Sequence, residues 1–244
     1  MKKSLLLILT LSVCVWAADS WQSKPFTEWS DKEIQKVLNS SPWSKEVSVP
    51  AGSGGGGGGR GRRGGGGGDT GDAPMSAGGT GAGGSRGGGG GDMSTPGGNL
   101  NSSINVIVSW RTALPCRQAI ARQKYGADAA TSADAKKMIE EPQKFYAIVV
   151  GGLPGRMLRG SSDEMKAGLL KNTMLEVKGK DPIQASDLQT AANGQQGMIV
   201  FLFPKTNPID ADDKEVEFVS RIGPMTVKQK FKLKDIMFNG KLEL

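Results

Sequence analysis

Residues 215–233 read EVEFVSRIGPMTVKQKFKL, and this stretch predicts a β-hairpin. The runs 215–222 and 225–233 are the two expected strands, and apolar and polar residues alternate with a period of two in the second. Gly223-Pro224 separates the two runs and is typical of a turn. A chain that ends in such a hairpin contains antiparallel sheet.

Lysines alternate with apolar residues in the second run of this hairpin. Side chains of a strand point to opposite faces in turn, so one face carries Val227, Phe231 and Leu233. The other face carries Lys228, Lys230, Lys232 and Lys234. We expect these lysines to face water and to prevent edge-to-edge pairing of sheets. The alternative is that they contact an anionic partner, such as lipid headgroups, cell-wall polymer or an acidic protein.

The rest of residues 100–244 predicts strands and helices in turn. Strands are expected at 104–110, 145–150, 174–178 and 198–203, and helices at 114–125, 132–141, 162–171 and 183–192. This stretch is long enough to form a single domain. We predict an α+β fold with a mixed, mostly antiparallel sheet and several helices.

The N-terminus has the features of a secretion signal. Two lysines precede the apolar run 5–15, and Val15 and Ala17 suit the positions three and one residues before a cleavage point. The apolar run is shorter than the roughly 20 residues of a transmembrane helix. We therefore expect residues 1–17 to be a signal peptide and the protein to be exported, to the periplasm or outside the cell, with no transmembrane segment in the mature chain.

The chain contains two cysteines, Cys14 and Cys116. Acylation of Cys14 would make the protein a lipoprotein, but Val13 stands where a small residue is expected. Otherwise Cys14 leaves with the signal peptide, and one remaining cysteine cannot form an intramolecular disulfide. We expect Cys116 to be a small buried residue on a helix.

A short helix is predicted within residues 18–50. Ser30 and Glu33 have the spacing of a capping box, and Trp29 and Ile34 have that of a hydrophobic staple. The helix ends before Pro42 and is too short to be stable alone in water.

The apolar side chains of this segment therefore need a surface to cover. They are Trp21, Trp29, Ile34, Val37, Leu38 and Trp43. That surface belongs either to the C-terminal domain of the same chain or to a protein of the cell envelope, and both readings stay open. Tryptophan is favoured at interfaces, so partner binding through these residues is a hypothesis.

Both ends of the chain resemble a family of uncharacterised bacterial secreted proteins. The segment KPFTEWSDKE at 24–33, followed by SPW at 41–43, is similar to a stretch that follows the signal peptide in that family. The C-terminal KFKLKD at 230–235 and GKLEL at 240–244 are similar to the end of its members. The resemblance implies export and a shared architecture, and it supplies no catalytic residue.

Glycine occupies 26 of the 49 residues from 51 to 99. Such a segment buries too little apolar surface to offset the entropy of ordering it, so we predict a disordered, flexible tether between 18–50 and 100–244. The alternative is an RGG arm that binds nucleic acid through its four arginines. Three aspartates nearly cancel those charges and no Phe or Tyr is interleaved, so nucleic acid is an unfavoured partner.

The composition excludes several kinds of catalytic site. The chain has no histidine, which removes the Ser-His-Asp arrangement and histidine-ligated metals. The glycine-rich run 151–156 follows a strand but lacks the spacing of a phosphate-binding loop. Asp210, Asp212, Asp213 and Glu215 lack the turn glycine and distal glutamate of a calcium loop. We expect no catalytic residue, no metal and no cofactor.

The charge balance indicates a weak attraction to anionic surfaces. The chain has 31 basic and 24 acidic residues, and loss of the signal peptide leaves 29 basic against 24 acidic, or +5. Our leading expectation is an exported, non-enzymatic binding or scaffold protein of the bacterial cell envelope. An envelope hydrolase that uses two carboxylates on glycan is the alternative, and an RGG-type nucleic-acid binder is the second.

Overall fold

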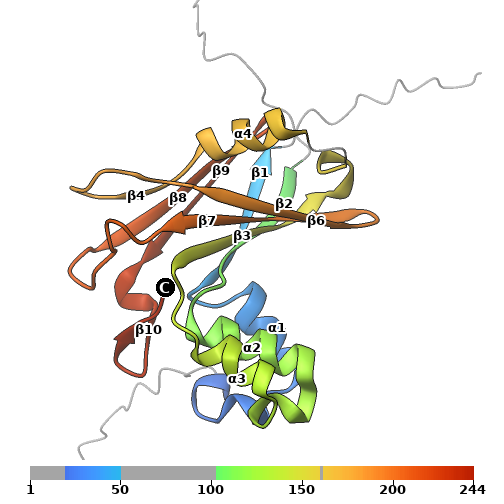
Figure 1. The fold of residues 1–244 in the computed structure, drawn as a ribbon, viewed down its shortest axis with the longest axis vertical. Coiled ribbons are helices and arrows are strands. Elements are labelled where there is room, and N and C mark those ends of the chain that lie inside the picture. The colour runs from blue at the N-terminus through green and yellow to red at the C-terminus, as the bar shows by residue number, and fades with distance from the viewer. Residues whose placement is uncertain (1–19, 51–102, 160–161) are drawn as a thin grey trace, which may run out of the picture.

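The computed structural model describes residues 20–50, 103–159 and 162–244 (Figure 1). The expected signal peptide, Cys14 and the glycine-rich stretch 51–99 lie outside these residues. Within them, none of the helices is both long and apolar enough to span a membrane.

Two antiparallel sheets form the body of the molecule. The larger sheet has the order β1-β2-β3-β7-β6, with β1 Ser44–Pro50, β2 Ser103–Trp110, β3 Phe145–Pro154, β7 Gln196–Pro204 and β6 Asp187–Asn193. The smaller sheet has the order β5-β4-β8-β9, with β5 Ile183–Gln184, β4 Thr173–Val177, β8 Glu215–Ile222 and β9 Met225–Lys232. A short hairpin follows, with β10 Met237–Phe238 and β11 Lys241–Leu242. These results confirm the α+β class and the mostly antiparallel pairing.

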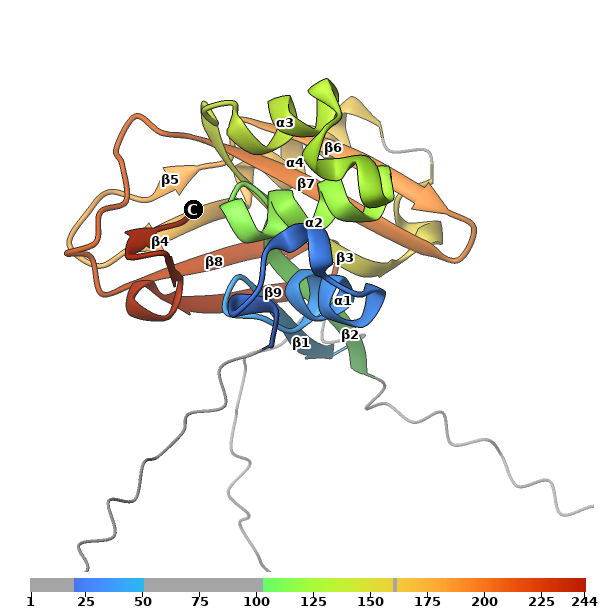
Figure 2. The same cartoon turned by 90° about the horizontal axis from the view of Figure 1, so that it is seen from below.

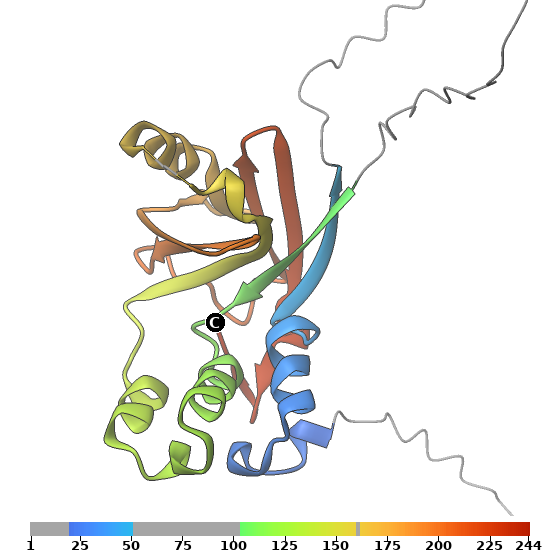
Figure 3. The same cartoon turned by 90° about the vertical axis from the view of Figure 1, so that its right-hand side faces the viewer.

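Of the four α-helices in the described residues, three gather at one end of the molecule. They are α1 Asp31–Asn39, α2 Leu114–Tyr125 and α3 Ala133–Glu140, and α2 lies between the other two (Figure 2). The fourth, α4 Asp163–Lys171, lies at the opposite end (Figure 3). Short 3₁₀ turns complete the fold, η1 Ser20–Gln22, η2 Phe26–Glu28, η3 Gly126–Ala130, η4 Gly155–Met157 and η5 Leu233–Asp235.

One predicted helix is wrong. Residues 183–192 form β5 and the first part of β6, and β6 pairs along β7 from Asp187↔Leu202 to Asn193↔Gln196. Alanine and glutamine favour a helix locally, but the ladder with β7 outweighs that preference.

Strand β1 was not predicted, and it changes the domain organisation that the sequence suggested. β1 pairs with β2 in a continuous register that ends at Pro50↔Ser103. Residues 51–102 therefore connect two neighbouring strands of one sheet and do not join two separate parts. The described residues 20–50 belong to the same folded body as the C-terminal region, and β1 also packs beside β9 (Figure 3).

The core lies between the two sheets and continues into the helical end. Phe201 and Phe203 of β7 face Phe218 of β8, with ring centroids 5.9 Å and 6.3 Å apart. Trp110 of β2 is fully buried and makes edge contacts with Tyr146 and Phe231. Close packing of this kind fixes how β2, β3 and β9 sit against one another.

Candidate functional site

The six apolar residues predicted to cover a surface are buried against this chain itself. Trp21, Trp29, Ile34, Val37, Leu38 and Trp43 are each at most 5% exposed. The ring of Trp21 lies 5.7 Å from that of Trp29 and 5.9 Å from that of Trp43, and it stacks on Phe238 at 6.3 Å. The sequence left two candidates for the surface that these residues cover, this chain or a protein of the cell envelope. In the structure they cover a surface of this chain. In this conformation these side chains are not accessible to a partner.

The capping box that begins α1 is present as expected. The backbone N–H and the hydroxyl of Ser30 both donate to Glu33 Oε2, at 2.8 Å and 2.7 Å. Trp29 and Ile34 are both buried, as a hydrophobic staple requires.

The lysine face of β9 has the predicted alternation, although the strand ends at Lys232, and Leu233 and Lys234 lie in η5. Val227, Phe231 and Leu233 are buried, whereas Lys228, Lys230, Lys232 and Lys234 are exposed. Lys230 Nζ lies 3.3 Å from Glu215 Oε1 and 3.9 Å from Glu217 Oε2 on β8. These glutamates partly neutralise the positive charge of the lysine face, which weakens its attraction for an anionic partner.

The aspartate-rich loop near residue 210 and the glycine-rich run 151–156 both contact other parts of the chain. Asp210 and Asp213 bind Lys180 Nζ, at 3.2 Å and 2.6 Å, and the described residues contain no cluster suited to a metal ion. Burial alone would raise the pKa of Asp213, but hydrogen bonds from Lys180 and from the Asp210 backbone N–H lower it overall. In the run 151–156, a Cβ on Gly155 would lie 2.6 Å from the carbonyl oxygen of Gly194, so this turn packs closely against another loop.

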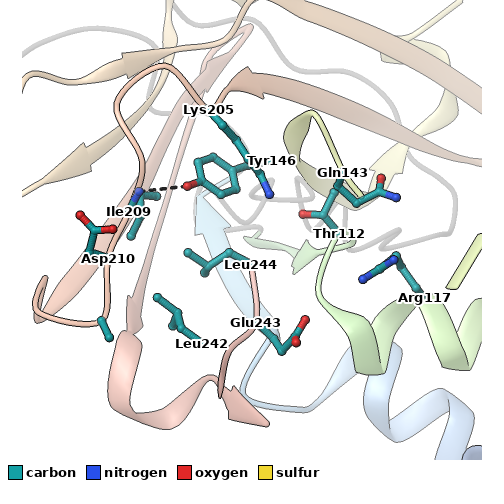
Figure 4. Close-up of a pocket in the computed structure, with 11 residues that line it drawn as sticks. Thr112, Arg117, Gln143, Tyr146, Lys205, Ile209, Asp210, Leu242, Glu243 and Leu244 are labelled. Atoms are coloured by element: carbon teal, nitrogen blue, oxygen red, sulfur yellow. Dashed lines mark hydrogen bonds between the residues drawn. The ribbon is translucent and has the colours of Figure 1, made fainter. Parts of the chain in front are cut away.

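A polar cavity of about 410 Å³ lies where the helical end meets the strands (Figure 4). Its polar lining includes Thr112, Arg117, Gln143, Tyr146, Lys205 and Glu243. None of these six was predicted as a site residue. We regard this cavity as the candidate site and call it the basic cavity.

Pairing of β3 with β7 brings Tyr146 and Lys205 together. Tyr146 is opposite Phe203 in the ladder, and Lys205 directly follows β7. Lys205 Nζ lies 4.6 Å from the centre of the Tyr146 ring, a cation–π contact that orients the ammonium without neutralising it. The Tyr146 hydroxyl accepts a hydrogen bond of 2.9 Å from the backbone N–H of Ile209, which fixes the loop on that side.

Arg117 reaches the cavity from the first turns of α2. Its Nη1 donates to the carbonyl oxygens of Ile139 and Glu141, where α3 ends. A helix C-terminus favours a cation, so these contacts hold the guanidinium in place. Its Nε is buried and has no hydrogen-bond partner among the described residues.

Glu243 forms another wall of the cavity. Its Oε2 accepts a hydrogen bond of 3.1 Å from the backbone N–H of Leu114, the first residue of α2. The N-cap residue Ala113 makes no side-chain cap bond, so Glu243 caps this helix from a distant part of the chain. The carbonyl oxygen of Glu243 accepts a hydrogen bond from the Trp43 indole at 2.9 Å.

Neither cation of the cavity is paired with a carboxylate at salt-bridge distance, although the charge of Glu243 acts on both. Among the described residues, neither Arg117 nor Lys205 has a carboxylate oxygen within 4.0 Å. Burial lowers the pKa of Lys205, the charge of Arg117 lowers it further, and Glu243 opposes both effects. Burial also lowers the pKa of Arg117, again opposed by Glu243. A nearby negative charge would favour the charged form of both side chains.

Comparison with known proteins does not identify the family of this chain. No protein-family model matches the chain, and no curated protein or solved structure matches it significantly. The resemblance to secreted bacterial proteins therefore stays a prediction from the sequence.

Proposed function

We propose that this chain is an exported, non-enzymatic binding protein of the bacterial cell envelope, and that it binds a small anion in the basic cavity. The envelope location in this proposal comes from the predicted signal peptide. The binding role comes from the cavity, and its main support is a pair of partly buried cations, Arg117 and Lys205, neither of which has a carboxylate at salt-bridge distance.

Two partly buried cations that repel each other lower the stability of a fold unless something compensates them. Groups with such perturbed pKa values, gathered in a concave site, are typical of functional sites. An anion bound between Arg117 and Lys205 supplies the missing charge, and charge-assisted hydrogen bonds to it are stronger than neutral ones.

The carboxylates of the cavity support binding over hydrolysis. Glycan hydrolysis requires two carboxyl groups free to act as acid and base or nucleophile. Glu243 is engaged by the N-terminus of α2, and Asp210 is paired with Lys180. Neither is positioned as an unoccupied catalytic group.

Calorimetric titration of the full chain with sodium propionate and sodium phosphate tests this proposal. We expect measurable binding of at least one anion to the wild type and loss of that binding in Lys205→Met. The matched control is Lys228→Met, which removes an exposed lysine of β9 and should leave binding unchanged. Equal binding by all three proteins, or by none, contradicts the proposal.

A further inference from the structure

We infer that the ligand of the basic cavity is a small monocarboxylate, and that Glu243 determines this preference for a single negative charge. This inference rests on the anion-binding function proposed above. It follows from the charges of the cavity, from how firmly Glu243 is held, and from the hydrogen-bond donors that remain free.

The cavity has room for one negative charge. Arg117 and Lys205 contribute two positive charges, and Glu243 is the carboxylate whose charge acts on both. Arg117, Lys205 and Glu243 together leave one positive charge. Asp210 also lines the cavity and shares Lys180 with Asp213, so that group carries one net negative charge and adds to the repulsion of a doubly charged ligand.

Glu243 cannot easily move away from an incoming ligand. Its carboxylate accepts from Leu114 N–H, its carbonyl accepts from Trp43 Nε1, and its N–H donates to the carbonyl of Ile236 at 3.2 Å. A second negative charge on the ligand would therefore lie in the field of a fixed carboxylate, and among the lining residues no third cation offsets it.

Two hydroxyl groups can add donors to the same ligand. The Thr112 hydroxyl accepts from Ala147 N–H at 3.3 Å, and the Tyr146 hydroxyl accepts from Ile209 N–H. Each has an acceptor role filled within the fold, which leaves its own O–H proton for a ligand oxygen. The lining of the cavity therefore offers two O–H donors in addition to the ammonium of Lys205.

Leucines form a small apolar part of the cavity wall. Leu242 and Leu244 line it and also pack, partly buried, against the core. A short aliphatic chain attached to the carboxylate would cover these leucines, which favours a carboxylate of this kind over inorganic phosphate.

The test compares propionate with malonate, in which a second carboxylate replaces the methyl group. We expect the wild type to bind propionate at least several-fold more tightly than malonate. Propionamide, which is neutral and of nearly the same shape, should not bind measurably. A wild type that binds malonate as tightly as propionate overturns the inference, whatever the variants do.

The variant Glu243→Gln isolates the charge, because glutamine keeps an oxygen that can accept from Leu114 N–H. The electrostatic energy of binding scales with the charge of the ligand. If the variant raises the affinity for propionate by some factor, it should therefore raise the affinity for malonate by about the square of that factor. The matched control Glu164→Gln removes an exposed carboxylate from α4, at the other end of the molecule, and should change neither affinity.

The outcomes separate this inference from the function on which it rests. If both the wild type and Glu243→Gln bind propionate, and the ratio of propionate affinity to malonate affinity is the same in both, then Glu243 does not set the preference. Anion binding itself would still stand. Absence of binding by every anion overturns the proposed function itself.

Discussion

The indole N–H of Trp43 donates a hydrogen bond of 2.9 Å to the carbonyl oxygen of Glu243, which lies 200 residues further along the chain. Trp43 comes from the segment that the sequence presents as a separate, tethered element, and Glu243 forms a wall of the basic cavity. This contact therefore ties the N-terminal tryptophan cluster to the geometry of the proposed binding site.

Truncation of Trp43 should destabilise the whole fold. Trp43 is 1% exposed and packs on Trp21 and Phe238, so Trp43→Ala leaves a large cavity and should lower the free energy of unfolding by about 3–5 kcal/mol. Urea denaturation measures this loss, with the exposed Phe145→Ala as a milder control. If Trp43→Ala unfolded at the same urea concentration as the wild type, residues 20–50 would not belong to the core.

Residues 51–102 should be dispensable for folding. Their two ends meet at the strand partners Pro50 and Ser103, so a short Asn-Gly-containing turn can replace the segment. Shortening the loop reduces the entropy of closure, which should raise the free energy of unfolding by about 2 kcal/mol. Chemical denaturation of the two proteins makes the comparison. A shortened chain that fails to fold would contradict the β1–β2 hairpin.

Anion binding should weaken at alkaline pH. Burial and Arg117 lower the pKa of Lys205 below its usual value of 10.5, and the ammonium is charged only below its own pKa. Affinity is therefore retained at neutral pH and lost as the pH rises through this lowered pKa. Affinity for propionate measured against pH tests this, with Lys205→Arg as a variant that keeps its charge throughout. An affinity that stays constant up to pH 11 in the wild type would exclude Lys205 as the titrating group.

Removing Lys205 should not reduce stability. In the folded state the ammonium is partly buried and has no carboxylate at salt-bridge distance, and a folded pKa below the unfolded value means that protonation of Lys205 opposes folding at neutral pH. Lys205→Met should therefore leave the free energy of unfolding unchanged or raise it by up to about 1 kcal/mol, while abolishing anion binding. Thermal unfolding without added anions provides the measurement. A large loss of stability would mean that Lys205 serves the fold and not a ligand.

Cys116 should be unreactive in the folded protein. Burial raises the pKa of its thiol to about 11, although Arg111 and the hydroxyls of Ser44 and Ser109 oppose this rise. A neutral, fully buried thiol is a poor nucleophile. Iodoacetamide labelling, followed by mass spectrometry of the Cys116 peptide, should require denaturant. Labelling in native buffer as fast as in denaturant would contradict this placement.

Local signals in the sequence account for most helices and for the final hairpin. Pro115 near the start of α2 and Gly126 at its end, with φ of 58°, define that helix from its own residues. The alternation that places Val227 and Phe231 on one face likewise predicts which face of β9 is buried. Such features depend on neighbours a few residues away, so they can be read without the fold.

Features that depend on distant partners were not predictable in the same way. β6 forms because β7 is beside it, and the tryptophan cluster shows only that a surface is needed, not whose surface it is. The basic cavity combines Arg117, Lys205 and Glu243 from three distant parts of the chain. No spacing in the sequence links these residues, because their proximity arises from sheet register and from the return of the C-terminal segment.

The most direct test of the account is an NMR titration of the isotope-labelled full chain with propionate at neutral pH. We predict saturable shifts of the Arg117 Nε–H resonance and of the Leu114 and Ile209 amides, with a single dissociation constant, and no shift at Lys228. Saturable shifts confined to residues outside the cavity, or no saturable shift at all, would contradict anion binding between Arg117 and Lys205.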